Sequence, residues 1–256
     1  MNFNSYIVSE TKTAYSVPLA EVLVPKKTFK QKAFTLAETL ITLSIIGVVA
    51  AITVPTLASS AMKHTYVVGL KKAYNQLTHA MKMIPIEENC GVDEFECAGL
   101  FESEVTNIDG KEFSGKSNRK LVYMLAKHLK AKPYIDQNYK PDQAPNCVNE
   151  LDCFLTEDGM IFSSYDSSDR NVVVDINGPK APNLRGRDVF TFGIAYKSVD
   201  NIKQGTVMPC GSKQYKHYHS GFAYWRDPYY MNQKYSKNTA SEVYTGRVLE
   251  TGKMDY

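Results

Sequence analysis

A single carboxylate interrupts the most apolar segment of the chain. Residues 34–54 read FTLAETLITLSIIGVVAAITV, and Glu38 is the only charged residue among them. A helix of about 20 such residues crosses a lipid bilayer. Lipid does not hydrate an ionised carboxylate, and a charge in a membrane helix costs about 2 to 3 kcal/mol. Glu38 therefore has to find a cation, and we expect it to have a function there.

Basic residues stand immediately before this segment. Four lysines fall within residues 26–32, and residues 1–33 together carry a net charge of +3. The rest of the chain contains 25 basic and 25 acidic residues. Lysines before a membrane span place that end in the cytoplasm, so we expect the chain beyond Pro55 to lie outside. The neutral body argues against a nucleic-acid partner.

The boundary Lys32-Ala33-Phe34-Thr35-Leu36-Ala37-Glu38 resembles the processing site of type IV pilins and type II secretion pseudopilins. That family has a basic leader, a small residue, a cut before Phe or Met, and a glutamate four residues beyond the new N-terminus. Gly47 and Pro55 fall where the family commonly has a helix-loosening glycine and a proline kink. The family usually has glycine before the cut. Alanine is the next smallest residue, so Ala33 predicts slower processing.

The resemblance implies that a prepilin peptidase cuts between Ala33 and Phe34 and that Phe34 is then N-methylated. It also implies four kinds of partner: the peptidase, other pilin or pseudopilin subunits, a cytoplasmic assembly ATPase and an inner-membrane platform protein. A neighbouring subunit's Phe34 amine can pair with Glu38 only at one axial offset, so the pair would fix the register of a filament. The implied location is the bacterial inner membrane, then a periplasmic or extracellular filament.

Two other classes of protein remain open. A plain signal anchor would make the chain a membrane-tethered binding protein that never polymerises, with Glu38 near the headgroups. A secretory signal cut after Ala51 would release a soluble protein, for example an enzyme, that begins near Ile52. A leader of 33 residues is long for such a signal. The sequence does not separate a pilus, a secretion pseudopilus and a DNA-uptake filament, nor a major from a minor subunit.

The apolar pattern continues one-sidedly from Pro55 to Pro85, with apolar residues three and four positions apart. This spacing predicts an amphipathic helix that extends the span to roughly fifty residues, about 75 Å long. We therefore expect a leader over 1–33, a long helix over 34–85 and an exported head over 86–256. The fold class is α+β, with the long helix packed on an antiparallel sheet in a pilin-like arrangement.

Within the head, periodicity predicts a helix over 117–130 and strands over 160–163, 172–176 and 189–195. Residues 213–256 are polar and rich in tyrosine, which predicts a loop-rich tail or an edge hairpin. Residues 110–117 satisfy the G-x-x-x-x-G-K-[ST] phosphate-loop pattern. A phosphate loop must follow a buried strand, and the polar residues 102–109 do not predict one. We find no combination of nucleophile, base and orienting group, so we do not expect an enzyme.

Five cysteines follow the apolar segment, and oxidising conditions outside the cytoplasm make disulfides the expectation. The economical local pairs are Cys90 with Cys97 and Cys147 with Cys153, which leaves Cys210 over. Connectivity does not follow from sequence, and a set of buried thiols is the alternative.

The sequence offers candidate ligands for one metal, calcium. Asp175, Asn177 and Asp188 offer the hard oxygens that calcium accepts, and the major pseudopilins hold calcium in a C-terminal loop. Asp and Asn are also the usual turn residues between strands. We therefore expect no cofactor and keep these three residues as calcium candidates.

Overall fold

The computed structural model describes residues 34–96, 99–101, 106–113, 119–141, 147–164, 171–219, 222–231 and 243–255. The chain divides into two compact units, Met1–Ala50 and Ala51–Tyr256. The described part of the first unit is the start of helix α1. The described part of the second unit holds the rest of α1 and the head.

Helix α1, Leu36–Glu87, contains 52 residues, which confirms the predicted long helix. Its apolar residues up to Val49 are exposed, whereas from Val67 onward one face is buried. The predicted end at Pro85 is wrong by two residues. Proline removes one helical hydrogen bond and disturbs the preceding turn, but the amides after it can still donate. The amide of Glu88 still donates to the Ile84 carbonyl at 3.0 Å, and that of Cys90 to the Pro85 carbonyl at 2.8 Å.

A six-stranded sheet forms the body of the head, in the order β3-β4-β5-β6-β7-β8. All neighbouring strands are antiparallel, as the sequence predicted. The three strands expected from the sequence are present to within one residue at each end. The strands are β3 Lys132–Pro133, β4 Cys153–Leu155, β5 Ile161–Ser164, β6 Asn171–Asp175, β7 Val189–Ile194 and β8 Val207–Pro209.

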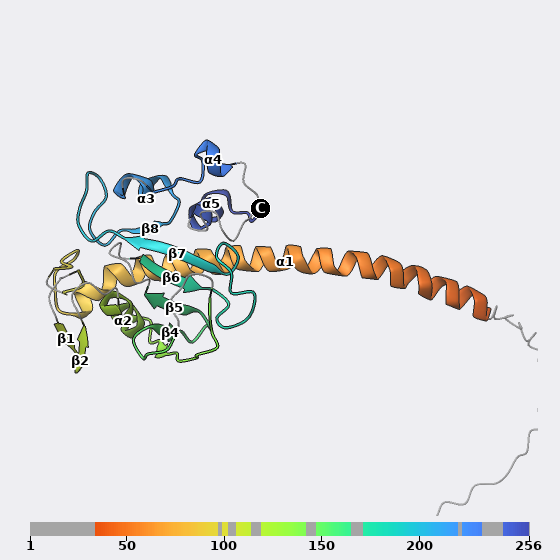
Figure 1. Ribbon diagram of the computed structural model, residues 1–256, viewed down its shortest axis with the longest axis horizontal. Helices are drawn as coiled ribbons and strands as arrows, with labels where there is room; N and C mark the ends of the chain where they lie inside the picture. Colours follow the sequence, from red (N-terminus) through yellow and green to blue (C-terminus); the bar gives the residue numbers. More distant parts are fainter. Residues whose placement is uncertain are drawn as a thin grey trace, which may run out of the picture. The chain divides into compact units, whose positions relative to one another are not determined.

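The central strands β6 and β7 are buried on both faces. Val172 and Val174 pair with Phe192 and Phe190 across the two strands, and these four side chains share one apolar core with the buried face of α1. The opposite face of β7 and β8 contacts helices α3, Lys213–Tyr218, and α5, Val243–Thr251 (Figure 1). The sheet therefore lies between α1 and the C-terminal helices.

The predicted helix over 117–130 is α2, Arg119–His128. Strands β1, Thr106–Ile108, and β2, Lys111–Phe113, form an antiparallel hairpin. Gly110 lies in the turn of this hairpin with a φ of 78°. The start of the phosphate-loop pattern thus joins two antiparallel strands instead of following a buried parallel one. Residues 114–117 lie outside the described part of the chain.

The expectation for residues 213–256 is wrong, because the described residues of this segment form three helices: α3, α4 (Pro228–Met231) and α5. Five residues of α5 are buried, although its sequence has only a few apolar positions. One of them is Gly246, where an added Cβ would lie 2.5 Å from the Ser212 nitrogen. The Thr191 amide also donates to the Thr245 hydroxyl at 3.1 Å. Contacts with residues that are distant in the sequence therefore stabilise α5. The local periodicity of the sequence does not reveal such contacts.

The burial of α1 in the head predicts a contrast between two substitutions on this helix. Leu77 is fully buried and Val68 is 53% exposed. Leu77→Ala should lower the free energy of unfolding by about 2 to 5 kcal/mol, because it leaves a cavity in the core. Val68→Ala should change it by less than about 0.5 kcal/mol. Denaturation of the full chain in detergent, followed by the fluorescence of the single tryptophan, Trp225, measures both. Equal losses would contradict the packing described.

Candidate processing and assembly site

The candidate site begins at the boundary between the basic leader and α1. Ala33 lies outside the described residues. Phe34 is 82% exposed, and Thr35 precedes the first residue of α1. The first helical hydrogen bond runs from the Thr39 amide to the Thr35 carbonyl at 3.1 Å. Phe34 thus lies just outside the helix and is accessible.

Thr35 and Glu38 form a reciprocal cap at the start of α1. The Thr35 amide and hydroxyl both donate to Oε2 of Glu38 at 2.8 Å, and the Glu38 amide donates to the Thr35 hydroxyl at 3.2 Å. This arrangement is a capping box, which satisfies amides that would otherwise have no partner at a helix N-terminus. The Thr-x-x-Glu spacing in the sequence is the signal of this capping box, which is a role for Glu38 separate from pairing with an amine.

The rest of the segment is an exposed apolar surface. In the described part of the chain, α1 is the one helix long and apolar enough to cross a membrane, and its most apolar 18-residue window is not buried at all. Gly47 and Pro55 both lie inside this helix. The open space around Gly47 would accommodate a side chain, so packing within this subunit does not require glycine there. Their loosening of the helix stays a prediction.

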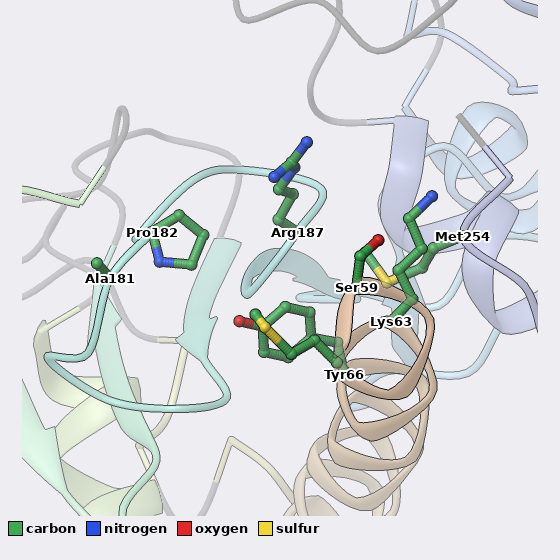
Figure 2. Close-up of a pocket in the computed structure, with 8 residues that line it drawn as sticks. Ser59, Lys63, Tyr66, Ala181, Pro182, Arg187 and Met254 are labelled. Atoms are coloured by element: carbon green, nitrogen blue, oxygen red, sulfur yellow. The ribbon is translucent and has the colours of Figure 1, made fainter. Parts of the chain in front are cut away.

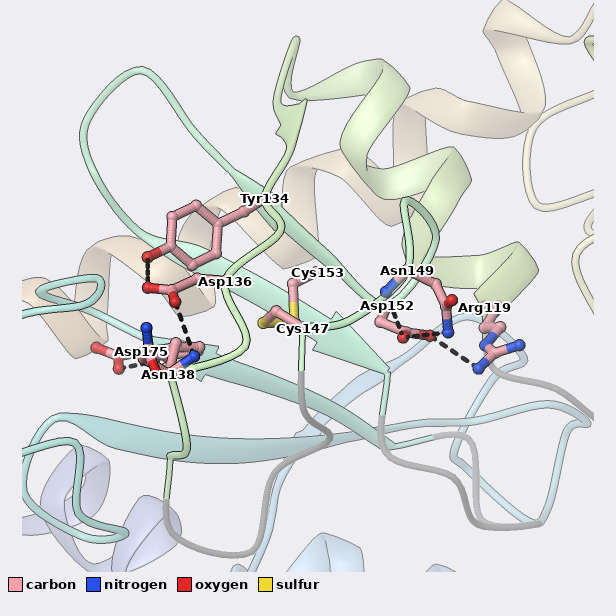
Figure 3. The surroundings of a disulfide bond; sticks show 10 residues. Arg119, Tyr134, Asp136, Asn138, Cys147, Asn149, Asp152, Cys153 and Asp175 are labelled. Atoms are coloured by element: carbon pink, nitrogen blue, oxygen red, sulfur yellow. Dashed lines mark hydrogen bonds and ion pairs between the residues drawn. A yellow bond between two sulfur atoms is a disulfide. The ribbon is translucent and has the colours of Figure 1, made fainter.

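The expected pair Cys147 and Cys153 forms a disulfide in the structure, with the two Cα atoms 5.3 Å apart (Figure 3). Both cysteines are fully buried. Asp152, beside the disulfide, accepts hydrogen bonds from the Asn149 amide and side chain and pairs with Arg119 at 2.8 Å. Cys90 is also disulfide-bonded, but Cys97 lies outside the described residues. Cys210 is a buried thiol.

The calcium candidates Asp175 and Asp188 are brought together as buried carboxylates, but all four of their oxygens already accept hydrogen bonds. Asp175 accepts from the Tyr139 hydroxyl at 2.7 Å and the Asn177 amide at 3.2 Å. Asp188 accepts from the amides of Asn183 at 2.9 Å and Leu184 at 2.7 Å. Each of these oxygens keeps a second lone pair, and the side-chain oxygen of Asn177 is buried without a hydrogen-bond partner. A calcium site at these three residues stays a prediction. Within the described residues, no group of three or more His, Cys, Asp or Glu side chains is placed to hold a metal.

The capping box predicts that Thr35 contributes to the start of α1 through its hydroxyl. Thr35→Val removes the hydroxyl at nearly constant shape and should cost about 1 kcal/mol. The amides of the first helical turn should then exchange with solvent about fivefold faster. Thr35→Ser keeps the hydroxyl and is the matched control. Hydrogen exchange of the chain in micelles measures both, and equal rates for the two variants would count against the cap.

The buried Asp175 predicts a pH dependence of stability. Burial raises its pKa to about 7, and the nearby charge of Asp188 adds to this effect, although the Tyr139 hydrogen bond opposes it. An unfolded Asp has a pKa of about 3.9. Between these two values the folded state holds a proton that the unfolded state has lost, so the free energy of unfolding should fall as the pH rises from about 4 to about 7.

Asp175→Asn should remove this part of the dependence and raise the free energy of unfolding at pH values above 7. Asp158→Asn provides a contrast. Burial raises the Asp158 pKa, but hydrogen bonds from Lys72, Thr156 and Gln76 outweigh it and lower the pKa overall. This second variant should therefore be less stable than the parent in the same buffer. Thermal melts across the pH range measure both. An Asp175→Asn chain less stable than the parent at every pH would contradict the argument.

One family model matches the chain, over residues 28–54: the prokaryotic N-terminal methylation motif. The match spans the end of the basic leader, the Ala33-Phe34 bond, Glu38 and the exposed apolar turns of α1. Neither the curated proteins nor the solved structures include a significant match. The motif and the exposed apolar helix fit single-pass anchoring in the inner membrane. Residues 28–54 thus carry the signature of the type IV pilins and pseudopilins, and they support a pilin-like precursor.

Proposed function

We propose that the chain is a structural subunit of a type IV pilus or a type II secretion pseudopilus. A prepilin peptidase removes residues 1–33, Phe34 is N-methylated, and the 34–54 segments of many subunits bundle into the core of a filament. The observation that carries the proposal is the methylation motif on a helix whose apolar surface is exposed. A soluble protein would bury such a surface, so it needs lipid or other subunits around it.

Glu38 is available for the contact that this assembly requires. Both hydrogen bonds that its side chain accepts from Thr35 fall on Oε2. A carboxylate has about four lone-pair sites on its two oxygens. The Phe34 amine of a neighbouring subunit can therefore bind Glu38 while the capping box remains. The carboxylate would serve its own helix through one oxygen and the next subunit through the other.

The proposed function implies where the precursor lies and which further partners it needs. Lysines before the span hold the precursor with its N-terminus in the cytoplasm and its head, residues 86–256, outside. A buried disulfide in the head is consistent with an oxidising compartment. Drawing subunits out of the membrane requires work, which a cytoplasmic ATPase would supply through a platform protein in the inner membrane.

Substitution of Glu38 tests the proposal. Glu38→Gln keeps an oxygen for the cap but removes the charge, so the chain should still insert and be cleaved. Assembly should fall at least tenfold, in line with the loss of a charge-assisted bond of about 1.5 to 3 kcal/mol. Ser44→Ala is the control, because Ser44 lies in the same span and its hydroxyl bonds only the Leu40 carbonyl among its described contacts. Sheared-filament yield compares the variants.

Mass spectrometry of the mature N-terminus accompanies this assay. Methylated Phe34 is the expected result, whereas an intact Met1 or a start near Ile52 would reject processing at Ala33. Normal filaments from Glu38→Gln would reject the register role of the carboxylate. A processed chain that never polymerises would instead indicate a membrane-tethered binding protein.

A further inference from the structure

A cavity of about 310 Å³ opens beside α1 at the edge of the head. Its walls come from three segments of the second unit: α1, the loop between β6 and β7, and the chain after α5 (Figure 2). Ligand sites in proteins begin at about this volume. The cavity is lined by Ser59, Met62, Lys63, Tyr66, Ala181, Pro182, Arg187 and Met254.

Among the described residues, the lining combines two cations, two hydroxyls and four apolar side chains, with no carboxylate among them. Arg187 presents a guanidinium from the loop, whereas Lys63 and Tyr66 come from α1 (Figure 2). Burial is the main cause that raises the pKa of Tyr66, so its hydroxyl is a hydrogen-bond donor at neutral pH. Guanidinium, ammonium and hydroxyl groups are the usual partners of phosphate oxygens. The apolar side chains match a ligand that is only partly polar.

The loop that carries Arg187 is held in place by buried contacts. Asp188 is fully buried, and its two oxygens accept the amides of Asn183 and Leu184. Gly186 packs so closely that an added Cβ would lie 2.5 Å from the Tyr244 ring. The side chain of Arg187 is exposed between these two anchored residues. The loop therefore presents the guanidinium from a fixed backbone.

The buried carboxylates do not remove the attraction for an anion. Asp175 and Asp188 lie near enough to Tyr66 to raise its pKa. Both are buried, and their oxygens accept hydrogen bonds from the loop and from Tyr139. Burial also raises the pKa of Asp175 to about 7, so its negative charge is only partly developed at neutral pH. Among the described residues, Lys63 and Arg187 are therefore the charged groups that line the cavity.

The position of the cavity along α1 indicates at which level of the membrane the cavity lies. From Leu36 to Lys63 the helix rises roughly 40 Å at 1.5 Å per residue. A bilayer with its headgroups is about 40–45 Å thick. With Leu36 at the cytoplasmic surface, Ser59 and Lys63 come to lie among the headgroups of the outer leaflet. Lys63 is also the first charged residue after Glu38. This step rests on the membrane anchoring that is part of the proposed function.

We propose that this cavity binds the headgroup of an anionic phospholipid of the outer leaflet. Arg187 and Lys63 bind the phosphate, and the hydroxyls of Ser59 and Tyr66 donate to phosphate or glycerol oxygens. Met62, Met254 and Pro182 contact the glycerol and the start of the acyl chains. The bound lipid holds the head against the membrane surface while the subunit is still in the bilayer.

Native mass spectrometry of the full chain in detergent tests the site, with phosphatidylglycerol and phosphatidylcholine offered at equal concentration. The parent should retain phosphatidylglycerol preferentially. Lys63→Gln with Arg187→Gln should reduce that preference about tenfold, because each charge-assisted contact is worth about 1.5 to 3 kcal/mol. Lys71→Gln is the control, since Lys71 is an exposed cation on α1 outside the cavity. Trp225 fluorescence checks that each variant is folded.

Three outcomes would overturn the inference. The double variant could retain phosphatidylglycerol as the parent does, or millimolar inorganic phosphate could displace the lipid, which would indicate a site for a free anion. The backbone amides around the cavity could also become protected from hydrogen exchange only when a second copy of the chain binds. That result would indicate that the cavity is a contact between subunits. The assay requires neither cleavage nor assembly. Lipid preference in a chain that forms no filaments would therefore reject the proposed function alone.

Discussion

The structure depends on the continuity of α1, because one part of this helix has to be stable in lipid and the other part in the core of the head. In lipid the backbone must bond to itself, which a helix does along its whole length. In the head the same helix supplies Leu70, Leu77 and Ile84 to the core. The exposed apolar turns near Glu38 and the buried turns beyond Val67 belong to one element of 52 residues.

The carboxylates on and near α1 are stabilised by hydrogen bonds from neighbouring groups. Glu38 is accommodated at the helix start because Thr35 supplies two donors to its carboxylate. Asp175 and Asp188 are accommodated in the head because hydroxyl and amide donors surround them. These donors tie both carboxylates to the backbone of the loop between β6 and β7. The same loop carries Arg187 at the cavity beside α1.

The prediction of the fold succeeded where burial follows a regular pattern. Strands β5, β6 and β7 read as apolar runs because both faces of the sheet are covered. The three-residue strands β4 and β8 are too short to show a period. Helix α5 was missed because Gly246 and Thr245 owe their burial to β7 and to Ser212, which lie far away in the sequence. Periodicity reports a local pattern, whereas these contacts are long-range.

The sequence by itself determined the methylation motif, since the charge pattern, the apolar length and the Ala33-Phe34-Glu38 spacing all lie within one contiguous stretch. A continuous helix needs no distant partner to bring such residues together. Only the tertiary structure decided what surrounds Asp188, and that Arg187, Lys63 and Met254 share one cavity. These residues come from three separate segments, and their proximity depends on how the sheet packs against α1. Packing of that kind is a property of the folded core, and no local spacing of residues predicts it.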